Sequence, residues 1–201
     1  MAFHDFTLTD VKKKLGLTVT DVDDLYGHLP AVPFPATLAA TLDRYLPIAL
    51  NMGTEKGRSE LLIAPMLFEL RLSHADRLSV FSGIDFSFDA AAELTGRCDF
   101  VVARNPLQLE LTAPACVLVE AKNENILAGV PQCLAEMVAA QRFNRAEGID
   151  LDRIGGVVTT GLQWRFLSLT GMHGQVDRVE YSLDIREKIY GILTHIALGT
   201  A

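Results

Sequence analysis

Three charged residues stand out because they lie in or directly after apolar segments typical of buried strands: Asp99, Glu120 and Lys122. A carboxylate among buried neighbours is unfavourable unless it is paired, protonated or bound to a metal ion. Residues two apart on a strand point to the same side, so Glu120 and Lys122 share one face of the predicted strand 115–122. We expect Asp99, on the predicted strand 94–104, to lie beside Glu120 if the two strands are neighbours.

This arrangement suits a divalent cation. Two carboxylates on adjacent strands supply the oxygen ligands that Mg²⁺ or Mn²⁺ takes, and they leave positions for water and phosphate. A bound cation activates water and neutralises the charge that builds on phosphorus during phosphodiester hydrolysis. Lys122 could orient or deprotonate that water, or offset the developing charge. The alternative is that Asp99 is a turn residue and that Glu120 and Lys122 form an exposed ion pair worth under about 1 kcal/mol.

Two further polar residues belong to predicted helices that flank this region. Glu60 lies on the apolar stripe of the predicted helix 56–73, which predicts that its side chain faces the sheet. The alternative is a carboxylate near the start of that helix, which the helix dipole favours. Gln132 is predicted in the first turn of helix 131–143, near the end of the strand that contains Lys122. The carboxyl ends of strands are where α/β proteins gather their sites.

The other residue types that could carry chemistry give no comparable pattern. The five histidines lack the spacing of metal ligands, and the three cysteines lack a CxxC pair. We therefore expect three buried cysteines in a protein of the reducing cytoplasm. The segment 171–174 is predicted to be a turn rather than a phosphate-binding loop. With 49% hydrophobic and 21% charged residues, and no apolar run long enough for a membrane span, the composition is typical of a soluble globular protein.

Periodicity and turn residues predict an α/β protein with one central mixed β-sheet flanked by helices, in the order α-βββ-α-ββ-α. The predicted helices are 37–50, 56–73, 131–143 and 183–198, and the predicted strands are 78–88, 94–104, 115–122, 155–160 and 164–169. Pro65 should bend or split the second helix. Residues 1–50 are predicted to form an N-terminal helical cap, and residues 51–201 the core.

The order Glu60, Asp99, Glu120-Ala121-Lys122, Gln132 resembles the pattern of the PD-(D/E)XK nuclease superfamily, which has the restriction-endonuclease-like fold. The segment 156–166 resembles a strand–turn–strand unit of the branch that includes the N-terminal nuclease domains of type I restriction subunits. The resemblance covers about residues 55–170 of the chain. It departs from the superfamily pattern at Cys98, a position where proline is common but variable.

That resemblance implies a role for each residue. Asp99 and Glu120 would be ligands of Mg²⁺ or Mn²⁺, Lys122 the catalytic lysine, and Glu60 a further acidic residue of the site. Gln132 would support the site or contact the nucleic-acid backbone. The implied function is metal-dependent hydrolysis of DNA phosphodiester bonds in restriction, repair or a mobile element. The alternative is a catalytically inactive module with a nuclease fold that binds or regulates.

The charge balance bears on this choice. The formal net charge is −7 and the pI is about 5.2, whereas proteins that bind DNA tightly usually show a basic face. An acidic total favours either the inactive module or a nuclease that relies on a partner protein to hold DNA. Six basic residues could still line one face: Arg58, Arg71, Arg97, Lys122, Arg142 and Arg145.

The predicted last helix suggests a homodimer. Its apolar positions extend well beyond one stripe, so the helix needs apolar cover on more than one side. The sheet can cover one side, and a second copy of the chain is the simplest source of the other, since two-fold dimers are the commonest oligomers. The alternative is that residues 1–50 cover the second side within one chain.

Overall fold

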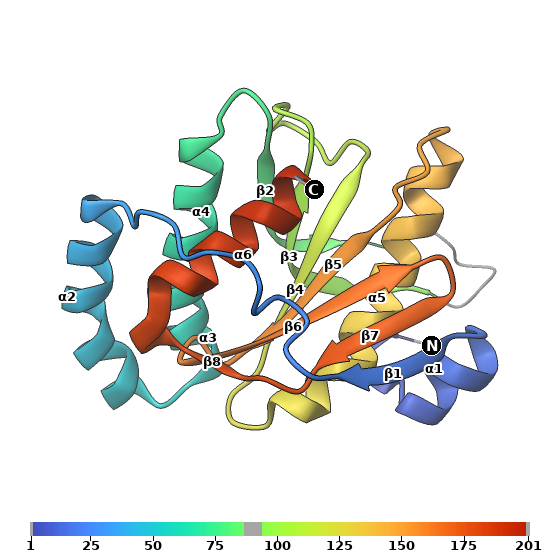
Figure 1. Cartoon of the computed structure of the whole chain (residues 1–201), viewed down its shortest axis with the longest axis horizontal. Coiled ribbons are helices and arrows are strands. Elements are labelled where there is room, and N and C mark those ends of the chain that lie inside the picture. Colours follow the sequence, from blue (N-terminus) through green and yellow to red (C-terminus); the bar gives the residue numbers. More distant parts are fainter. Residues whose placement is uncertain (1, 87–93, 200–201) are drawn as a thin grey trace.

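The apolar segments in the middle of the chain form the central strands of a mixed sheet of eight strands (Figure 1). The computed structural model describes residues 2–86 and 94–199. The strand order is β1-β7-β6-β5-β4-β3-β2, and β8 pairs with β6 outside this path. The strands are β1 (Thr18–Val22), β2 (Ser79–Asp85), β3 (Arg97–Ala103), β4 (Ala115–Ala121), β5 (Ile154–Thr159), β6 (Gln163–Thr170), β7 (His173–Asp177) and β8 (Tyr181–Ser182). The predicted α/β class with one mixed sheet is confirmed.

Helices cover both faces of this sheet (Figure 1). They are α1 (Leu8–Lys14), α2 (Ala36–Met52), α3 (Glu55–Arg58), α4 (Ala64–Ser73), α5 (Ile126–Ala146) and α6 (Arg186–Leu198), with short 3₁₀ helices at Phe3–Asp5 and Leu183–Ile185. One apolar core joins α2, α4 and α6 to strand residues such as Val119 and Phe166. A second core joins α1 and α5 to Leu118 and Leu167 on the other face. Successive strand residues therefore enter different cores, as expected for a sheet covered on both sides.

The strand register brings the two acidic strand residues together. β3 and β4 are antiparallel neighbours, as predicted, and Phe100 lies opposite Val119. Asp99 precedes Phe100 and Glu120 follows Val119, so continuing the ladder by one residue places Asp99 beside Glu120. β4 and β5 are parallel and are joined through α5, so their carboxyl ends lie at the same edge of the sheet.

The predicted helix 56–73 consists of three consecutive helical parts. α3 is followed by a π-helix, η2 (Ser59–Ile63), and then by α4, in which Pro65 occupies the first turn. Proline has no N–H to donate and its ring clashes with the carbonyl four residues earlier. A π-helical turn before Pro65 accommodates the ring by widening the backbone spacing. The backbone stays helical from Glu55 to Ser73, so Pro65 is marked by a change from π- to α-helix rather than by the predicted bend or split.

The helix predicted at 131–143 starts earlier than expected. α5 begins at Ile126, and the side chain of Asn125 caps it by accepting a hydrogen bond from the Ala128 N–H at 3.3 Å. Pro131 therefore lies inside the helix rather than in its first turn. The carbonyl that loses its donor is that of Leu127, an exposed residue of the first turn, where water can replace the missing N–H.

The N-terminal segment adds a strand to the sheet, which the prediction of an N-terminal helical cap over residues 1–50 did not include. β1 pairs in parallel with β7, and Thr18 lies opposite His173. α1 packs on α5 from the same side of the sheet. α2 also continues to Met52, two residues past the predicted boundary at residue 50. β1 escaped prediction because it is a short edge strand whose partner lies near the other end of the chain.

The wide apolar surface of α6 is covered within the chain. Tyr190 packs edge-to-face on Phe34 with ring centroids 5.5 Å apart, and its hydroxyl lies 3.1 Å from Ser73 Oγ on α4. Lys188 donates hydrogen bonds to the carbonyls of Gly27 and Leu29. The segment before α2 thus provides the second side of cover. The apolar surface of α6 therefore gives no ground for a homodimer. The predicted alternative, in which residues 1–50 cover this surface within one chain, matches the structure.

Three smaller expectations can be checked as well. Cys98, Cys116 and Cys133 are all buried and carry free thiols, as predicted. Gly171 and Met172 form the tight turn between β6 and β7. The sequence predicted a turn at residues 171–174 but not the strand β7 that follows it. In the described ranges no helix has the length and apolar character to cross a membrane. Residues 87 and 88 of the predicted strand 78–88 lie outside the described residues.

Candidate active site

The candidate site lies at the carboxyl ends of β4 and β5. Lys122 follows β4 directly, and its backbone N–H donates to the Thr159 carbonyl at the end of β5, with an N···O distance of 2.8 Å. Glu120 lies opposite Val158 on β5, one residue before that strand ends. Two adjacent strands therefore hold the backbone of Glu120 and Lys122 on a rigid frame. α3 and α5 lie close by, since Arg58 of α3 donates to Asn123, the residue after Lys122, and Gln132 of α5 contacts Lys122.

Glu120 and Lys122 form a largely buried ion pair. Lys122 Nζ donates to Glu120 Oε1, and the two side chains are 22% and 3% exposed. This finding removes the alternative of an exposed surface pair between them. The second carboxylate oxygen, Glu120 Oε2, is buried and has no hydrogen-bond partner among the described residues. A buried carboxylate oxygen without a donor is unfavourable, so this atom is open to a ligand.

Two opposing influences set the protonation of the pair. Burial, and after it the negative charge of Asp99, raises the pKa of Glu120 to about 7, against the opposing effect of Lys122. Burial by itself would lower the pKa of Lys122, but the charge and hydrogen bond of Glu120 raise it above its usual value. Lys122 is therefore a cation at neutral pH, while Glu120 is close to its titration midpoint. A cation bound beside Glu120 would favour its ionised form.

Asp99 is held toward β4 by a hydrogen bond. Its Oδ2 accepts a hydrogen bond from the backbone N–H of Ala121 on β4, with an N···O distance of 2.8 Å. Asp99 is half-buried and is the largest charged influence on the pKa of Glu120 after burial itself. The structure therefore brings together Asp99, Glu120 and Lys122, as the strand patterns predicted. The reading of Asp99 as a turn residue is wrong, since it lies within β3.

Gln132 supports the site from the second turn of α5, not from the first turn as predicted. Its side-chain carbonyl Oε1 accepts from Lys122 Nζ at 3.2 Å. Its amide Nε2 donates to Oε1 of Glu136 at 3.1 Å, one helical turn further on. The residue is 8% exposed, so these contacts are shielded from bulk water. Because α5 begins earlier than predicted, Gln132 lies in its second turn, but its side chain still contacts Lys122.

Glu136 is a functional candidate that the sequence analysis missed. It is completely buried in α5, and its Oε2 has no hydrogen-bond partner among the described residues. Burial, followed by the charge of Glu120, raises its pKa well above the usual value for a glutamate, which favours its neutral form. The available signal was a glutamate four residues after Gln132, with apolar residues on both sides. Such a residue on the buried face of a helix rarely serves packing alone.

Glu60 does not face the sheet, so that prediction is wrong. Its side chain is 61% exposed and pairs with Lys56 at 3.1 Å on the helix surface. The reason is the π-helix around it, because a π-helical turn contains more residues than an α-helical turn and rotates the following positions. A stripe counted at 3.6 residues per turn therefore places Glu60 on the wrong side.

Glu55 on α3 is a helical acidic residue whose charge acts on the pair. Its charge raises the pKa of both Glu120 and Lys122, so it lies near the pair. Thr54 caps the helix at this point through a hydrogen bond from the Gly57 N–H at 3.1 Å, which fixes Glu55 in the first turn. The sequence analysis began this helix at residue 56 and so did not consider Glu55.

A glycine holds α5 against the lysine. A Cβ atom at Gly129 would lie 2.6 Å from Val158 Cγ1 and 3.0 Å from Lys122 Cε. These distances are too short for a side chain, so only glycine lets α5 approach β5 and the Lys122 stem this closely. On the other side, Arg58 of α3 donates through Nη2 to the carbonyl and side-chain oxygens of Asn123. Lys122 is thus positioned by Gly129, Gln132 and the anchored residue after it.

A surface pocket of about 470 Å³ adjoins this edge of the sheet. It is lined by Arg58, Asn123, Glu124, Asn125, Ile126, Leu127, Thr160, Leu162, Gln163 and Glu180. Two of these residues are acidic, and Arg58 is the single basic one in the lining. Within residues 2–86 and 94–199, no group of three or more His, Cys, Asp and Glu side chains is arranged to hold a metal ion. Any cation here must therefore take most of its ligands from water and substrate.

Comparison with known proteins does not add a family. No protein-family model matches the chain, and no curated protein matches its sequence. The functional argument therefore depends on the geometry of this site.

Proposed function

We propose that this chain is a nuclease with a restriction-endonuclease-like core, of the PD-(D/E)XK type, that hydrolyses DNA phosphodiester bonds with Mg²⁺ or Mn²⁺. One observation supports the proposal most strongly. A buried carboxylate oxygen, Glu120 Oε2, lacks any partner beside a second carboxylate, Asp99, while the other oxygen of Glu120 holds a lysine. A purely structural ion pair has no reason to leave one oxygen unsatisfied.

The residues fit a Mg²⁺ ion in the form that such sites usually take. Mg²⁺ is commonly held by one or two protein carboxylates, with waters and substrate phosphate completing the octahedron. Asp99 and Glu120 supply those two carboxylates, so the proposal does not require a cluster of three His, Cys, Asp or Glu side chains, which the described residues lack. A bound ion would supply Lewis acidity and lower the pKa of a coordinated water.

Lys122 acts in this proposal as a fixed positive charge rather than as a base. Its raised pKa keeps it protonated at neutral pH, so it cannot readily accept a proton from water. From its position beside Glu120 it can donate hydrogen bonds to a phosphate oxygen and stabilise negative charge there. Gln132 holds the ammonium group at 3.2 Å, so the lysine is oriented before substrate arrives.

The test is a cleavage assay with Mg²⁺ or Mn²⁺ on linear, circular and single-stranded DNA, with an RNA substrate alongside. We expect metal-dependent cleavage that Lys122→Ala abolishes, in a protein that still folds but is less stable because the buried Glu120 loses its partner. Lys14→Ala is the matched control, since Lys14 forms an exposed pair with Asp10 on α1. Cleavage by Lys122→Ala at the wild-type rate would contradict the proposed role of the lysine.

A second candidate is a module with this fold that binds or regulates without cutting. The pocket beside the site favours it, because Glu124 and Glu180 line that pocket and repel DNA phosphates. The same observation suits a nuclease that receives DNA from a partner protein. Adding a basic DNA-binding partner would separate the two, since only the nuclease would then cut.

A homodimer remains part of the proposal for one reason alone. Two sites related by a two-fold axis could cut both strands of a duplex. Light scattering at micromolar concentration decides this point, and a mass near 22.0 kDa would rule the dimer out.

A further inference from the structure

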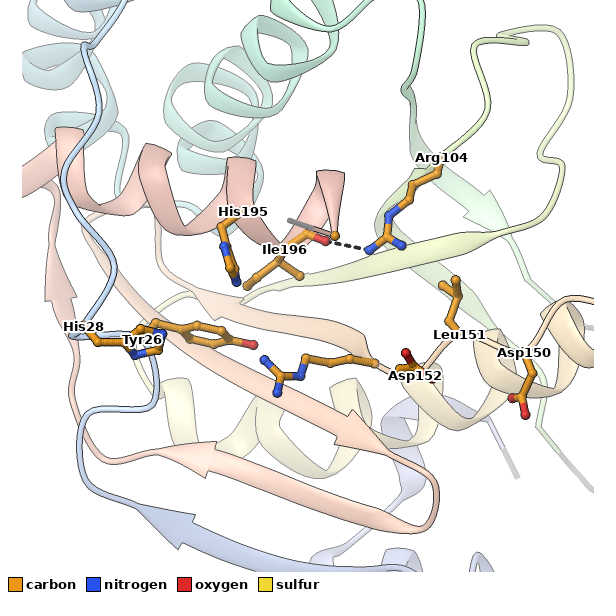
Figure 2. Close-up of a pocket in the computed structure, with 10 residues that line it drawn as sticks. Tyr26, His28, Arg104, Asp150, Leu151, Asp152, His195 and Ile196 are labelled. Atoms are coloured by element: carbon orange, nitrogen blue, oxygen red, sulfur yellow. Dashed lines mark hydrogen bonds between the residues drawn. The ribbon is translucent and has the colours of Figure 1, made fainter. Parts of the chain in front are cut away.

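A second polar pocket lies at the opposite edge of the sheet from Glu120 (Figure 2). Arg104 follows the carboxyl end of β3, and Arg153 precedes the amino end of β5. Because β3 is antiparallel and β5 parallel to β4, both arginines lie near the amino end of β4. The seven residues of β4 separate this edge from the candidate active site by roughly 20 Å. The pocket is therefore a different site.

We call this cavity the Tyr26 pocket. Its volume is about 510 Å³. It is lined by Tyr26, His28, Arg104, Asp150, Leu151, Asp152, Arg153, His195, Ile196 and Gly199. These residues come from the segment before α2, from the end of β3, from the connection between α5 and β5, and from the end of α6.

Tyr26 presents a buried hydroxyl without a partner. The residue is 1% exposed, and among the described residues its hydroxyl has no hydrogen-bond partner. Figure 2 shows the hydroxyl directed away from His28 and into the pocket, below His195 and Ile196. Burial raises the pKa of Tyr26, so the group stays protonated and can donate. Ser168 and Arg153 lie close enough to act on the pKa of this hydroxyl, but neither has hydrogen-bond geometry to it, and the hydroxyl faces a cavity.

The electrostatic surroundings of His195 show that this part of the pocket is positive. Burial lowers the pKa of His195, and the positive charges of Arg153 and His28 lower it further. No acidic group is among the causes of this shift. His195 also contacts Tyr26 edge-to-face, with ring centroids 6.5 Å apart, and at the Tyr26 hydroxyl the positive charge of Arg153 is opposed in part by the buried Asp177.

The two acidic residues of the pocket, Asp150 and Asp152, differ in whether their carboxylates are available to bind a ligand. Asp150 accepts a hydrogen bond from Arg145 Nε at 3.0 Å, and its carboxylate is directed away from Tyr26 in Figure 2. Asp152 lies nearer to Tyr26 than Asp150 does and is exposed, so its carboxylate offers a hydrogen-bond acceptor at the rim of the pocket. Arg104 has a structural role, because it donates to the Ala197 carbonyl at 2.7 Å and to the Ile196 carbonyl at 3.0 Å at the end of α6.

We propose that the Tyr26 pocket binds a hydroxyl-bearing organic phosphate monoester, with the phosphate between Arg153, His195 and the Tyr26 hydroxyl. All three groups can donate hydrogen bonds and Arg153 adds a positive charge, while phosphate offers acceptors and negative charge. The organic part lies along Ile196 and Leu151, and its hydroxyl groups donate to Asp152. The pocket is larger than a bare phosphate needs, which is why we assign an organic ester rather than the free ion. The proposal does not depend on nuclease activity.

Isothermal titration calorimetry on the full chain tests the proposal with four probes: ribose phosphate, a nucleoside monophosphate, inorganic phosphate and ribose. We expect at least one of the two esters to bind at least about tenfold more tightly than inorganic phosphate, and ribose not to bind. The comparison of the two esters identifies whether the organic part is a sugar or a nucleoside. Binding of inorganic phosphate as tightly as the better of the two esters, or no binding of any phosphate, would overturn the assignment.

Two variants test the residues. Arg153→Gln should weaken binding of the better ester about tenfold, as expected for loss of a charge-assisted hydrogen bond. Tyr26→Phe should weaken it about fivefold, while thermal stability stays the same or rises, because the lost hydroxyl has no partner in the unliganded protein. Arg178→Gln is the control, since Arg178 pairs with Asp21 and Asp23 beside β1, outside the pocket lining. Unchanged affinity in both pocket variants would refute the proposal.

Discussion

Gln132 Nε2 donates to Glu136 Oε1 at 3.1 Å, and this contact decides which end of the Gln132 amide faces Lys122. An amide can present its carbonyl to the lysine only if its NH₂ group has an acceptor elsewhere. Glu136 provides that acceptor from a fully buried position. Without it, the amide could turn and direct its NH₂ group toward the ammonium of Lys122, which would be unfavourable. Glu136 thus acts through Gln132 as a positioning residue.

This relationship predicts different results for two substitutions at one position. Glu136→Gln keeps a side-chain carbonyl that can accept from Gln132, so we expect Lys122 to behave as in the wild type. Glu136→Met fills a similar volume but cannot accept well, so Lys122 should become more mobile and more reactive. Competitive acetylation of lysines, followed by mass spectrometry, measures Lys122 reactivity without requiring cleavage. Any cleavage activity should fall about tenfold or more in Glu136→Met, the scale expected for lost orientation.

The same measurement separates positioning from general destabilisation. The acetylation rates of Lys14 and Lys56, on the exposed surfaces of α1 and α3, provide an internal control. A rise at Lys122 alone supports the positioning role. Equal reactivity of Lys122 in Glu136→Met and Glu136→Gln would contradict it.

The raised pKa of Glu120 predicts how stability depends on pH. The pKa is about 7 in the folded chain and 4.5 for an unperturbed glutamate, so the folded state holds a proton that the unfolded state releases between these values. The resulting stabilisation is complete below pH 4.5 and is lost as the pH rises through about 7. The loss is on the order of 3 kcal/mol at most, since each pKa unit corresponds to about 1.4 kcal/mol. Urea unfolding from pH 5 to 8 measures it.

Glu120→Gln is the matched variant for this titration, because glutamine stays neutral throughout. The difference in unfolding free energy between wild type and variant should change by up to about 3 kcal/mol across the same range. Glu136 is present in both proteins, but the charge of Glu120 helps to raise its pKa, so its titration cancels only in part. Parallel pH profiles for the two proteins would show that Glu120 does not titrate in this range.

The proposed cation site predicts the opposite pH trend for metal binding. Carboxylate ligands must be ionised, so Mg²⁺ or Mn²⁺ should stabilise the protein more at pH 8 than at pH 6. Thermal denaturation with and without the metal measures this difference, and chelation with EDTA should reverse it. Asp99→Asn should abolish the metal-dependent shift while removing the charge that helps to raise the pKa of Glu120. A metal-dependent shift of the same size in Asp99→Asn would exclude Asp99 as a ligand.

Gly129 predicts an unusual response to alanine. In an exposed helix position, glycine to alanine normally stabilises by about 0.5–1 kcal/mol. At Gly129 the added methyl group meets Val158 on a central strand and the Lys122 stem, so we expect destabilisation of about 1–3 kcal/mol. Leu127→Ala, on the exposed face of the same turn, is the control and should cost little. Thermal denaturation of both variants and Lys122 acetylation in Gly129→Ala provide the readout.

The central strands could be predicted from sequence because their pattern is local and strong. β3 and β4 consist of consecutive apolar residues, and the charged residues in them, Asp99 and Glu120, stand out against that background. β3 and β4 are consecutive along the chain and joined by one loop, so their pairing, and with it the proximity of Asp99 to Glu120, was also predictable. β1 and β8 were missed because one is a short edge strand that pairs with distant β7 and the other has only two residues.

The helical part of the site was less predictable for a specific physical reason. Counting at 3.6 residues per turn assumes a regular α-helix, and the π-helix at Ser59–Ile63 breaks that assumption. The start of α5 was misplaced because Pro131 is typical of a first turn, whereas Asn125 caps the helix earlier. Glu136 was missed because burial of a single helical glutamate depends on the whole layer packed against α5.

The contrast between Glu55 and Glu60 predicts a difference between two otherwise similar substitutions. Both are exposed glutamates on the helical segment before β2, and both lie within the same two helical turns. Only Glu55 acts electrostatically on Glu120 and Lys122, whereas Glu60 pairs with Lys56 on the outer surface. Glu55→Gln should therefore lower the pKa of Glu120 and alter metal-dependent cleavage, while Glu60→Gln should leave both as in the wild type.

Carboxyl ¹³C chemical shifts followed by NMR across pH 4 to 9 would give the Glu120 pKa in each protein. The expected shift for Glu55→Gln is a fraction of a pKa unit, because Glu55 is the smallest of the influences on Glu120 and its charge is exposed to solvent. The loss of an exposed pair with Lys56 in Glu60→Gln should cost under about 1 kcal/mol of stability. If Glu60→Gln, rather than Glu55→Gln, changed the Glu120 titration or the cleavage rate, the acidic residue implied by the nuclease resemblance would be Glu60 after all. The π-helix would then have to rearrange when substrate binds, since that is the only way to turn Glu60 from the solvent toward the end of β4.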